Sequence, residues 1–260
     1  MVDKHPKIRI RELYKSFNNN SVLNGIDLDI SKGESLVVIG ESGVGKSVLL
    51  KNIIGLLTPD TGSIKIDGNE TVGLTPPENK MFLNKFGMLF QNGALFDSLT
   101  VWENIAFGLI EGQGMKKKKA QEIVIEKLKD VGLKPDIGFL SPAELSGGMH
   151  KRVGLARAIA TEPEVILFDE PTTGLDPIMG DVINDLIIDC VKRLKATALS
   201  ITHDMESARK IGNKIAMIYK GRIIWVGPVS EVDNSGNDII NRFIQGDAKR
   251  LVKNGIGAAP

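Results

Sequence analysis

The sequence predicts an α/β fold built around a phosphate-binding loop, with an antiparallel β layer before the loop and a helical insert after it. Three observations predict this fold. A short apolar run at residues 35–39 leads into a glycine-rich loop and then a helix-forming stretch. Further apolar runs at residues 165–169 and 198–202 end in polar residues, as buried parallel strands do. Residues of about 92–160 have helical spacing instead.

The glycine-rich loop at residues 40–47 fits the spacing G-x-x-x-x-G-K-[ST]. Its glycines permit backbone angles and close approaches that a Cβ would prevent. Its amides and the helix that follows can then attract an anion. We expect Lys46 to reach the β- and γ-phosphates of a nucleotide and the Ser47 hydroxyl to ligate Mg²⁺. The residues expected to contact the nucleotide here are Gly40, Glu41, Ser42, Gly43, Val44, Gly45, Lys46, Ser47 and Val48.

Length and composition fit one globular domain with a subdomain. The 260 residues include 33 Lys and Arg and 32 Asp and Glu, a formal charge of +1, so we do not expect nucleic acid as a partner. The single cysteine, Cys190, excludes an intramolecular disulfide framework and suits a reducing compartment. No apolar stretch approaches the ~20 residues of a membrane span. We therefore expect any role at a membrane to come through a partner.

Residues 7–30 alternate as strands do and are expected to form the antiparallel layer, with a turn at Asn18, Asn19 and Asn20. Tyr14 and Phe17 stand just before this turn. An aromatic side chain there can stack on adenine or pack in the core, and position alone leaves both interpretations open. Short strands are also expected at residues 63–68 and 86–91.

Within the helical insert, the stretch at residues 101–106 follows Thr100, a suitable N-cap. The lysines at 116–119 are interpreted as a solvated helix face, with contact to anionic headgroups as the less favoured alternative. Near its end, Leu145-Ser146-Gly147-Gly148-Met149 precedes a helix. A helix cap is the simplest interpretation of this segment, and an anion site is the alternative.

Two polar groups follow the apolar strands. Asp169 ends the run at 165–169, Glu170 directly follows it, and His203 directly follows the run at 198–202. Ligands bind at the carboxyl ends of parallel strands, beside the phosphate loop. We therefore expect Asp169 to hold Mg²⁺, Glu170 to polarise the attacking water and His203 to contact the γ-phosphate. A purely structural histidine is the alternative.

Five motifs in this order make the chain resemble an ABC-type ATPase over nearly its whole length. Gln91 matches the Q-loop, residues 145–149 the signature, residues 165–170 the Walker B strand with its glutamate, residues 174–176 the D-loop and His203 the switch histidine. The resemblance implies an ATPase domain at residues 1–246, with a helical subdomain at about 92–160, and a C-terminal tail at 247–260.

The resemblance also implies a head-to-tail homodimer that holds each ATP between one subunit's phosphate loop and the other's signature. It assigns Ser146, Gly147 and Gly148 to the opposite nucleotide's γ-phosphate, and the D-loop residue Asp176 to the nucleotide site as well. Gln91 is expected to contact Mg²⁺ and relay the nucleotide state, and Phe17 rather than Tyr14 to stack on adenine. Catalysis is expected from Glu170, His203, Lys46 and Gln91.

Met149 stands where many members of the family have Gln. With residues 90–100, it is similar to the Mla/Mce-type branch. This branch implies ATP-driven transport of phospholipids or other lipids between the inner membrane and the cell envelope. The implied partners are an integral membrane permease, a small regulatory subunit and a periplasmic Mce-type lipid-binding protein. The ATPase would then lie peripherally on the cytoplasmic face of the inner membrane.

Two rival functions remain. A non-transport ABC ATPase acting on ribosomes or DNA would resemble two cassettes in one chain or carry a long coiled-coil insertion. An ABC importer ATPase for amino acids, metals or sugars would share the chemistry but not the cargo. Sugar-type members usually add a large C-terminal regulatory domain, and the segment after Trp225 is short for one.

Overall fold

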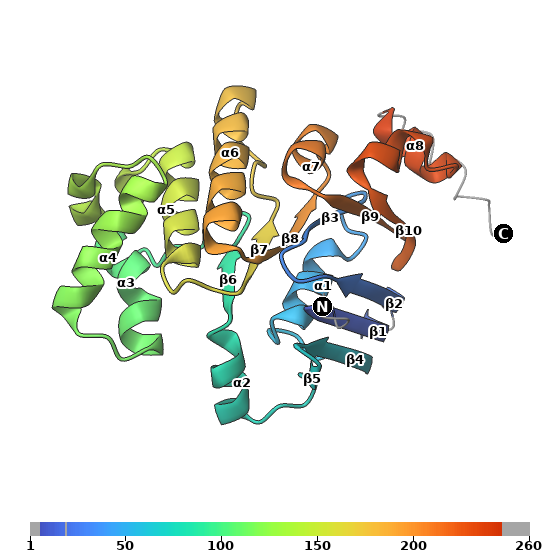
Figure 1. The fold of residues 1–260 in the computed structure, drawn as a ribbon, viewed down its shortest axis with the longest axis horizontal. Helices are drawn as coiled ribbons and strands as arrows, with labels where there is room; N and C mark the ends of the chain where they lie inside the picture. Colours follow the sequence, from blue (N-terminus) through green and yellow to red (C-terminus); the bar gives the residue numbers. More distant parts are fainter. Residues whose placement is uncertain (1–5, 19, 246–260) are drawn as a thin grey trace.

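The computed structural model describes residues 6–18 and 20–245. Two β-sheets pack on either side of helix α1 (Lys46–Ile53), as Figure 1 shows. Leu49, Leu50 and Ile53 of this helix are buried among apolar side chains of both sheets. Burying such a side chain contributes about 1.5–3 kcal/mol, so this shared core stabilises the helix that follows the phosphate loop. The expected α/β fold is confirmed.

The smaller sheet is the antiparallel layer expected from residues 7–30. Its strand order is β2-β1-β4-β5, and β1 pairs antiparallel with both β2 and β4. Asn18 has a φ of 46°, which fits the turn between β1 and β2, while Asn19 lies outside the described residues. The strands are β1 (Ile8–Phe17), β2 (Asn20–Ile30), β4 (Thr61–Ile66) and β5 (Asn69–Glu70).

The larger sheet carries the functional edge. Its order is β10-β9-β3-β8-β7-β6, with β9, β3, β8, β7 and β6 parallel and β10 antiparallel to β9. Every residue of β7 is buried, as expected for a central parallel strand. The strands are β3 (Ser35–Ile39), β6 (Phe86–Leu89), β7 (Val165–Asp169), β8 (Thr197–Thr202), β9 (Lys214–Tyr219) and β10 (Arg222–Pro228).

Register places the ends of these strands side by side. Ile39 of β3 is paired with Thr202 of β8, and Asp169 of β7 with Ile201 of β8. Because parallel strands point the same way, the residues that follow them share one edge of the sheet. Gly40, Glu170 and His203 therefore all begin at this edge.

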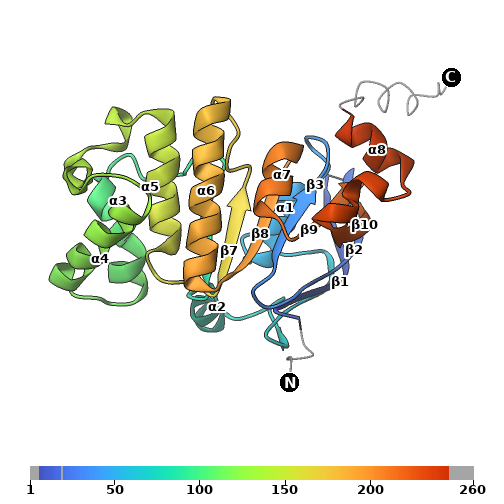
Figure 2. The same cartoon turned by 45° about the horizontal axis from the view of Figure 1, so that its top comes forward.

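Helices between β6 and β7 form a group at one end of the molecule, beside α6 (Pro177–Leu194), as seen in Figure 2. Thr100 caps the first of them, with Glu103 completing a capping box. The domain boundaries expected near 92 and 160 stay a prediction, and the expected tail at 247–260 lies outside the described residues. The group comprises α3 (Val101–Phe107), the π-helical segment η1 (Gly108–Gly112), α4 (Lys117–Asp130), the 3-10 turns η2 (Pro135–Phe139) and η3 (Pro142–Glu144), and α5 (Gly147–Ile159).

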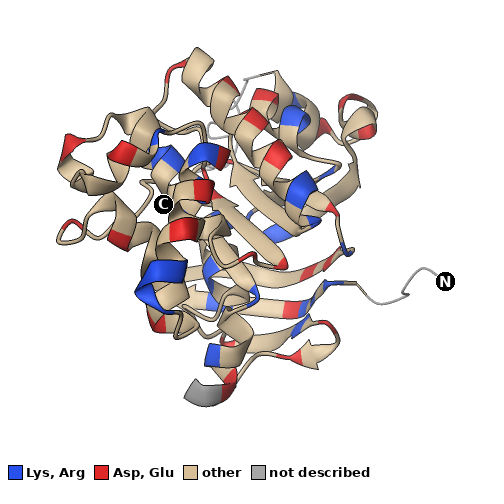
Figure 3. Cartoon of the chain, turned by 60° about the vertical axis from the view of Figure 1, so that its left-hand side comes forward, with Lys and Arg blue, Asp and Glu red and all other residues tan. Residues whose placement is uncertain are grey.

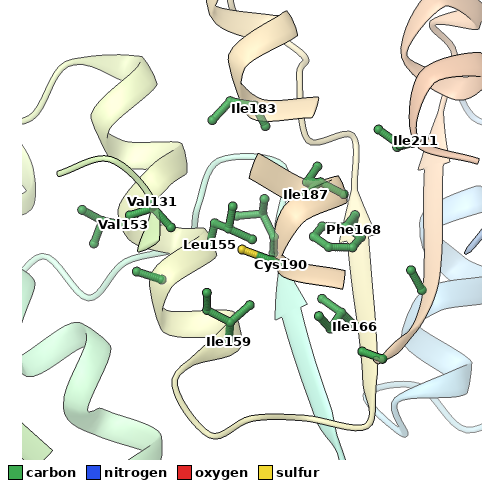
Figure 4. Close-up of a cluster of buried hydrophobic side chains, with 14 of the residues drawn as sticks. Val131, Val153, Leu155, Ile159, Ile166, Phe168, Ile183, Ile187, Cys190 and Ile211 are labelled. Atoms are coloured by element: carbon green, nitrogen blue, oxygen red, sulfur yellow. The ribbon is translucent and has the colours of Figure 1, made fainter. Parts of the chain in front are cut away.

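A second core joins this group to the larger sheet. Figure 4 shows side chains of α5 and α6 meeting Ile166 and Phe168 of β7, with Cys190 among them. Phe168 is fully buried. The remaining helical elements are α2 (Pro76–Leu83), before β6, α7 (Met205–Ile211), after β8, and η4 (Val229–Asn234) and α8 (Asp238–Ile244), after β10.

Basic and acidic residues are interspersed over the elements seen in Figure 3. The lysines at 116–119 are exposed at the start of α4, and Lys117 Nζ lies 5.2 Å from the centre of the Trp102 ring. Within residues 6–18 and 20–245, no helix combines the length and apolar character needed to cross a bilayer.

Candidate functional site

A cavity of about 950 Å³ lies where β3, β6, β7 and β8 end. It gathers most residues of the predicted phosphate loop together with Phe17, Gln91, Glu170 and His203. Residues from six distant parts of the sequence therefore meet around one space. The lining residues are Phe17, Val22, Glu41, Ser42, Gly43, Gly45, Lys46, Ser47, Val48, Gln91, Glu170, Thr173, His203 and Phe243.

The phosphate loop needs glycine at two of its positions for steric reasons. A Cβ on Gly40 would lie 2.6 Å from the Ile218 carbonyl oxygen, and one on Gly45 2.9 Å from Leu23 Cδ2. Gly45 also has a φ of 106° as the N-cap of α1. The loop therefore passes close to other segments of the same chain. Its amides lie just before a helix N-terminus, an arrangement that binds phosphate.

Lys46 is held inside this loop. Its Nζ donates to the carbonyl oxygens of Gly40 and Glu41, at 2.8 Å each, and lies 3.6 Å from Glu170 Oε1. Burial lowers the pKa of Lys46, while the carboxylates of Glu170 and Asp169 act in the opposite direction. A cation thus stands at the floor of the cavity, where the phosphates of a nucleotide would lie.

Ser47 and Asp169 offer the oxygen ligands that Mg²⁺ prefers. Ser47 Oγ donates to Asp169 Oδ1 at 3.1 Å, at the end of β7. Burial raises the pKa of the Asp169 carboxyl, an effect that a bound cation would reverse. A hydroxyl and a carboxylate at the mouth of a phosphate loop fit Mg²⁺. Gln91, the third expected ligand, lines the same cavity.

Glu170 has an unusual backbone and a crowded carboxylate. Its φ is 48°, in the left-handed region that few non-glycine residues adopt. Oε2 accepts from Thr173 Oγ1 at 2.9 Å and lies 2.8 Å from His203 Nδ1. Such strain typically marks functional positions. A carboxylate fixed in this way can act as a general base for water in the cavity.

Thr173 is a site residue that the sequence did not reveal. Its hydroxyl contacts Glu170 Oε2, yet the segment after Glu170 contains two adjacent threonines, and no local pattern distinguishes them. Of these two threonines, Thr173 bonds the carboxylate, whereas the Thr172 hydroxyl lies 3.2 Å from Ser207 Oγ.

The signature and D-loop residues lie outside the cavity. Ser146 caps α5, accepting from the Met149 amide at 3.3 Å, and Asp176 caps α6, accepting from the Met179 amide at 3.0 Å. Gly148 packs against Met179, whose Cε lies 2.6 Å from where a Cβ would stand. The helix-cap interpretation of Ser146 thus holds within one chain. The contact of Ser146, Gly147, Gly148 and Asp176 with nucleotide stays a prediction that needs a second copy.

Two aromatic side chains line the cavity. Phe17 is 42% exposed, and Lys15 Nζ lies 5.5 Å from its ring centre. Tyr14 instead donates its hydroxyl to Glu12. Phe243 comes from α8, and no motif in the sequence around it indicated this position. An aromatic wall with a nearby cation can accommodate a nucleotide base.

The parallel sheet, the phosphate loop and the carboxylate beside it define a P-loop ATPase. Comparison with known proteins gives its family. The ABC transporter family profile matches residues 23–173, which is more than half of the chain. The chain belongs to the ABC transporter family and is an ATPase that binds ATP, as the sequence predicted.

Curated relatives agree with this assignment. The probable ribonucleotide transport ATP-binding protein mkl of Mycobacterium leprae is 40% identical over 92% of this chain and 69% of its own length. The Arabidopsis thaliana protein Trigalactosyldiacylglycerol 3 is 41% identical over 94% of this chain and 75% of its own length. The methionine import ATP-binding protein MetN 3 of Bacillus cereus is 41% identical, over 91% and 69%. The chain thus spans about two thirds to three quarters of their lengths.

A solved structure also matches. A dimeric ATP-binding cassette in a post-hydrolysis state, bound to ADP and Pi, has a TM-score of 0.80 and 30% identity, covering 85% of this chain and 98% of that one. The expected ABC ATPase fold is confirmed by this likeness.

Proposed function

We propose that this chain is the ATP-hydrolysing subunit of a transporter that moves phospholipids or other lipids between the inner membrane and the cell envelope. The cavity of about 950 Å³, with a phosphate loop on one side and Glu170 and His203 on the other, carries the catalytic part of this proposal. The lipid cargo is supported by residues 90–100 and Met149 and by the relative named for a galactosylated diacylglycerol.

In the proposed mechanism the chain positions ATP and stabilises charge. The amides of the loop and Lys46 bind the phosphates. Ser47, Asp169 and Gln91 would hold Mg²⁺, which would supply charge neutralisation at the transferred phosphoryl group. Glu170 accepts a proton from the attacking water, and Thr173 orients its carboxylate. His203, 2.8 Å from Glu170 Oε2, can donate to the γ-phosphate.

Two copies of the chain are required in this proposal. Ser146 and Gly147 are exposed at the start of α5, outside the cavity, so their backbone amides are available to the nucleotide of another subunit. ATP contacted from both subunits stabilises the closed homodimer, and hydrolysis removes that contact. Gln91, between β6 and the helical group, would relay the change.

A permease would dock on an apolar groove of about 390 Å³ between the end of α2, β6 and α3. Phe96 and Phe107 are 45% and 42% exposed there, with ring centres 4.9 Å apart. Leu56 and Leu83 extend the exposed apolar surface. An apolar groove of this kind suits the apolar face of a helix from a partner. The ATPase would then lie on the cytoplasmic face of the inner membrane, with a small regulatory subunit and a periplasmic Mce-type protein completing the complex.

An importer for another small cargo is the second candidate. Its support is the 41% identity to the methionine import protein MetN 3, which is as high as the identity to the relatives named above. The ATPase chemistry would be the same, so only the partner and its cargo separate the two candidates.

Purification of the tagged chain with its membrane partner, followed by mass spectrometry of bound small molecules, tests the proposal. A permease with bound phospholipid supports lipid transport, while a permease with bound amino acid supports the importer. Recovery with ribosomes or DNA and no permease would contradict both. Phe107→Asp should abolish recovery of the permease. Phe139→Asp is the matched control, because Phe139 is 80% exposed and belongs to η2, not to the groove.

A further inference from the structure

A buried lysine connects the helical group to the cavity. Lys151 lies in the second turn of α5 and is 5% exposed. Its Nζ donates to the main-chain oxygen of Gln91 and, at 3.2 Å, to that of Glu170. Both acceptor residues line the cavity. One ammonium group therefore joins the chain that leaves β6 to the chain that leaves β7.

Packing alone does not explain why a lysine occupies position 151. An ammonium group is costly to bury unless hydrogen bonds compensate, and an apolar side chain of similar length would fill the same space without that cost. Burial lowers the pKa of Lys151, and the nearby carboxylates of Asp169 and Glu170 oppose that change. Position 151 thus carries a buried ammonium group that is costly to desolvate, and its hydrogen bonds go to Gln91 and Glu170.

The contact also bears on the strained backbone of Glu170. A φ of 48° is unfavourable for a glutamate, so contacts with neighbouring residues must stabilise this backbone conformation. Its amide donates to the Ile201 oxygen at 3.0 Å, and its carbonyl accepts from the Thr173 amide at 3.3 Å and from Lys151. Of these three hydrogen bonds, the one from Lys151 comes from the helical group. It holds the Glu170 carbonyl, whose orientation is set by the left-handed backbone conformation of that residue.

Helix α5 holds the chain after Gln91 in the same manner. Arg157 donates to the carbonyl oxygens of Gly93, at 2.8 Å, and Ala94, at 2.7 Å. Together with Lys151, it fixes three main-chain oxygens of residues 91–94 to one helix. A displacement of α5 would therefore carry Gln91 with it and pull on Glu170.

We propose that Lys151 is a positioning residue for ATP hydrolysis. By holding the carbonyls of Gln91 and Glu170 together, it keeps the Glu170 carboxylate in its productive place and couples that place to α5. This inference rests on the proposed roles of Gln91 and Glu170. Lys151 acts through these residues and needs no direct contact with the nucleotide.

Steady-state ATP turnover of the full chain and ATP affinity, both measured on folded variants, test this inference. Lys151→Met removes the donors and should lower kcat at least about ten-fold, because misplacing a catalytic group is costly even when binding is intact. The Kd for ATP should change by less than about two-fold, since Lys151 lies outside the cavity lining. Lys151→Gln offers one N–H to each carbonyl and should restore kcat to within about three-fold of the parent.

Lys127→Met is the matched control. Lys127 is also a buried lysine of the helical group, 2% exposed, but it bonds Glu126 and Glu162 at 3.1 and 3.3 Å, away from the cavity. It should lower the melting temperature and leave kcat within about two-fold of the parent. Lys151→Ala is the second variant if Lys151→Met does not fold, and it should lose kcat in the same way.

Parent-like kcat in folded Lys151→Met or Lys151→Ala would overturn the inference, as would a Lys151→Gln protein as slow as Lys151→Met. Glu170→Gln, measured in parallel, separates this failure from failure of the proposed function. If Glu170→Gln is inactive while Lys151→Met is fully active, only the role of Lys151 is wrong. If Glu170→Gln turns over ATP at the parent rate, the catalytic assignment itself is wrong.

Discussion

Glu170 and His203 meet across the ends of β7 and β8, with His203 Nδ1 2.8 Å from Glu170 Oε2. The Glu170 side chain is 11% exposed and that of His203 is 55% exposed. The carboxylate is thus largely shielded, while the imidazole faces the open cavity. This arrangement lets the histidine contact both the base and a phosphate beyond it.

Glu170→Gln should retain ATP binding and lose hydrolysis. The amide keeps the size of the side chain but cannot accept a proton, and general-base catalysis contributes about 10²–10⁴-fold. We expect turnover to fall at least about 100-fold, with the Kd for ATP within about three-fold of the parent. Hydrolysis at the parent rate would show that another group activates water.

Thr173→Val should slow hydrolysis without weakening ATP binding. The substitution removes the hydroxyl that donates to Glu170 Oε2 at 2.9 Å and keeps the volume of the side chain. A hydrogen bond to a charged group is worth about 1.5–3 kcal/mol, so we expect kcat to fall by about ten-fold or more. Thr173→Ser should restore it. Thr172→Val, which changes a neighbouring hydroxyl not bonded to Glu170, is the control, and an equal loss there would refute the assignment.

Lys46→Ala should weaken nucleotide binding itself. The ammonium group stands 5% exposed inside the loop, where it would bond phosphate oxygens. Loss of hydrogen bonds to charged groups predicts a Kd for ATP about 10–100-fold higher. Calorimetric titration with ATP measures it, with Lys65→Ala, an exposed lysine of β4, as the control. Unchanged affinity in Lys46→Ala would contradict the phosphate-loop assignment.

Phe17→Ala should reduce the affinity for ATP, whereas Tyr14→Ala should not. Phe17 lines the cavity, and Tyr14 contacts Glu12 instead. Stacking of a base on an aromatic ring is worth about 1–3 kcal/mol, which predicts about a 5–160-fold higher Kd. Competition between ATP and inorganic triphosphate, which lacks a base, separates the contribution of the base contacts from that of the phosphate contacts. Equal effects of the two substitutions would remove Phe17 from the adenine site.

The residues at the functional edge of the larger sheet could be predicted because they follow a pattern that is local in the sequence. A buried parallel strand followed by a polar residue is visible in the sequence, and every such strand delivers its last residues to the same edge. The sequence alone therefore predicted that Lys46, Asp169, Glu170 and His203 lie together. The antiparallel layer was likewise readable from alternation over residues 7–30.

Contacts across the fold were not predictable in this way. Register shifts between Leu13 and Tyr14 and between Lys15 and Ser16 interrupt the alternation of β1, so counting residues could not decide which aromatic faces the cavity. In the sequence, a buried lysine on a helix cannot be distinguished from a solvent-exposed lysine, so the role of Lys151 was not predicted. Phe243 reaches the cavity from α8, far along the chain. Each of these positions depends on tertiary packing.

In the proposed mechanism two chains complete each other's nucleotide sites, and disulfide crosslinking tests this most directly. The measurement uses Glu170→Gln protein in which Cys190, the only cysteine of the chain, is replaced by Ala. Ser42→Cys and Ser146→Cys are introduced into separate, differently tagged preparations. Only a contact between two molecules can then join the two engineered cysteines.

With Mg-ATP, oxidation of the mixed preparations should give a heterodimer linked between positions 42 and 146, and without nucleotide this product should be absent. Lys65→Cys mixed with Ser146→Cys is the control and should give no product, since Lys65 lies in the smaller sheet, outside the cavity. The same yield with and without ATP, or no product although both proteins bind ATP, would contradict the account.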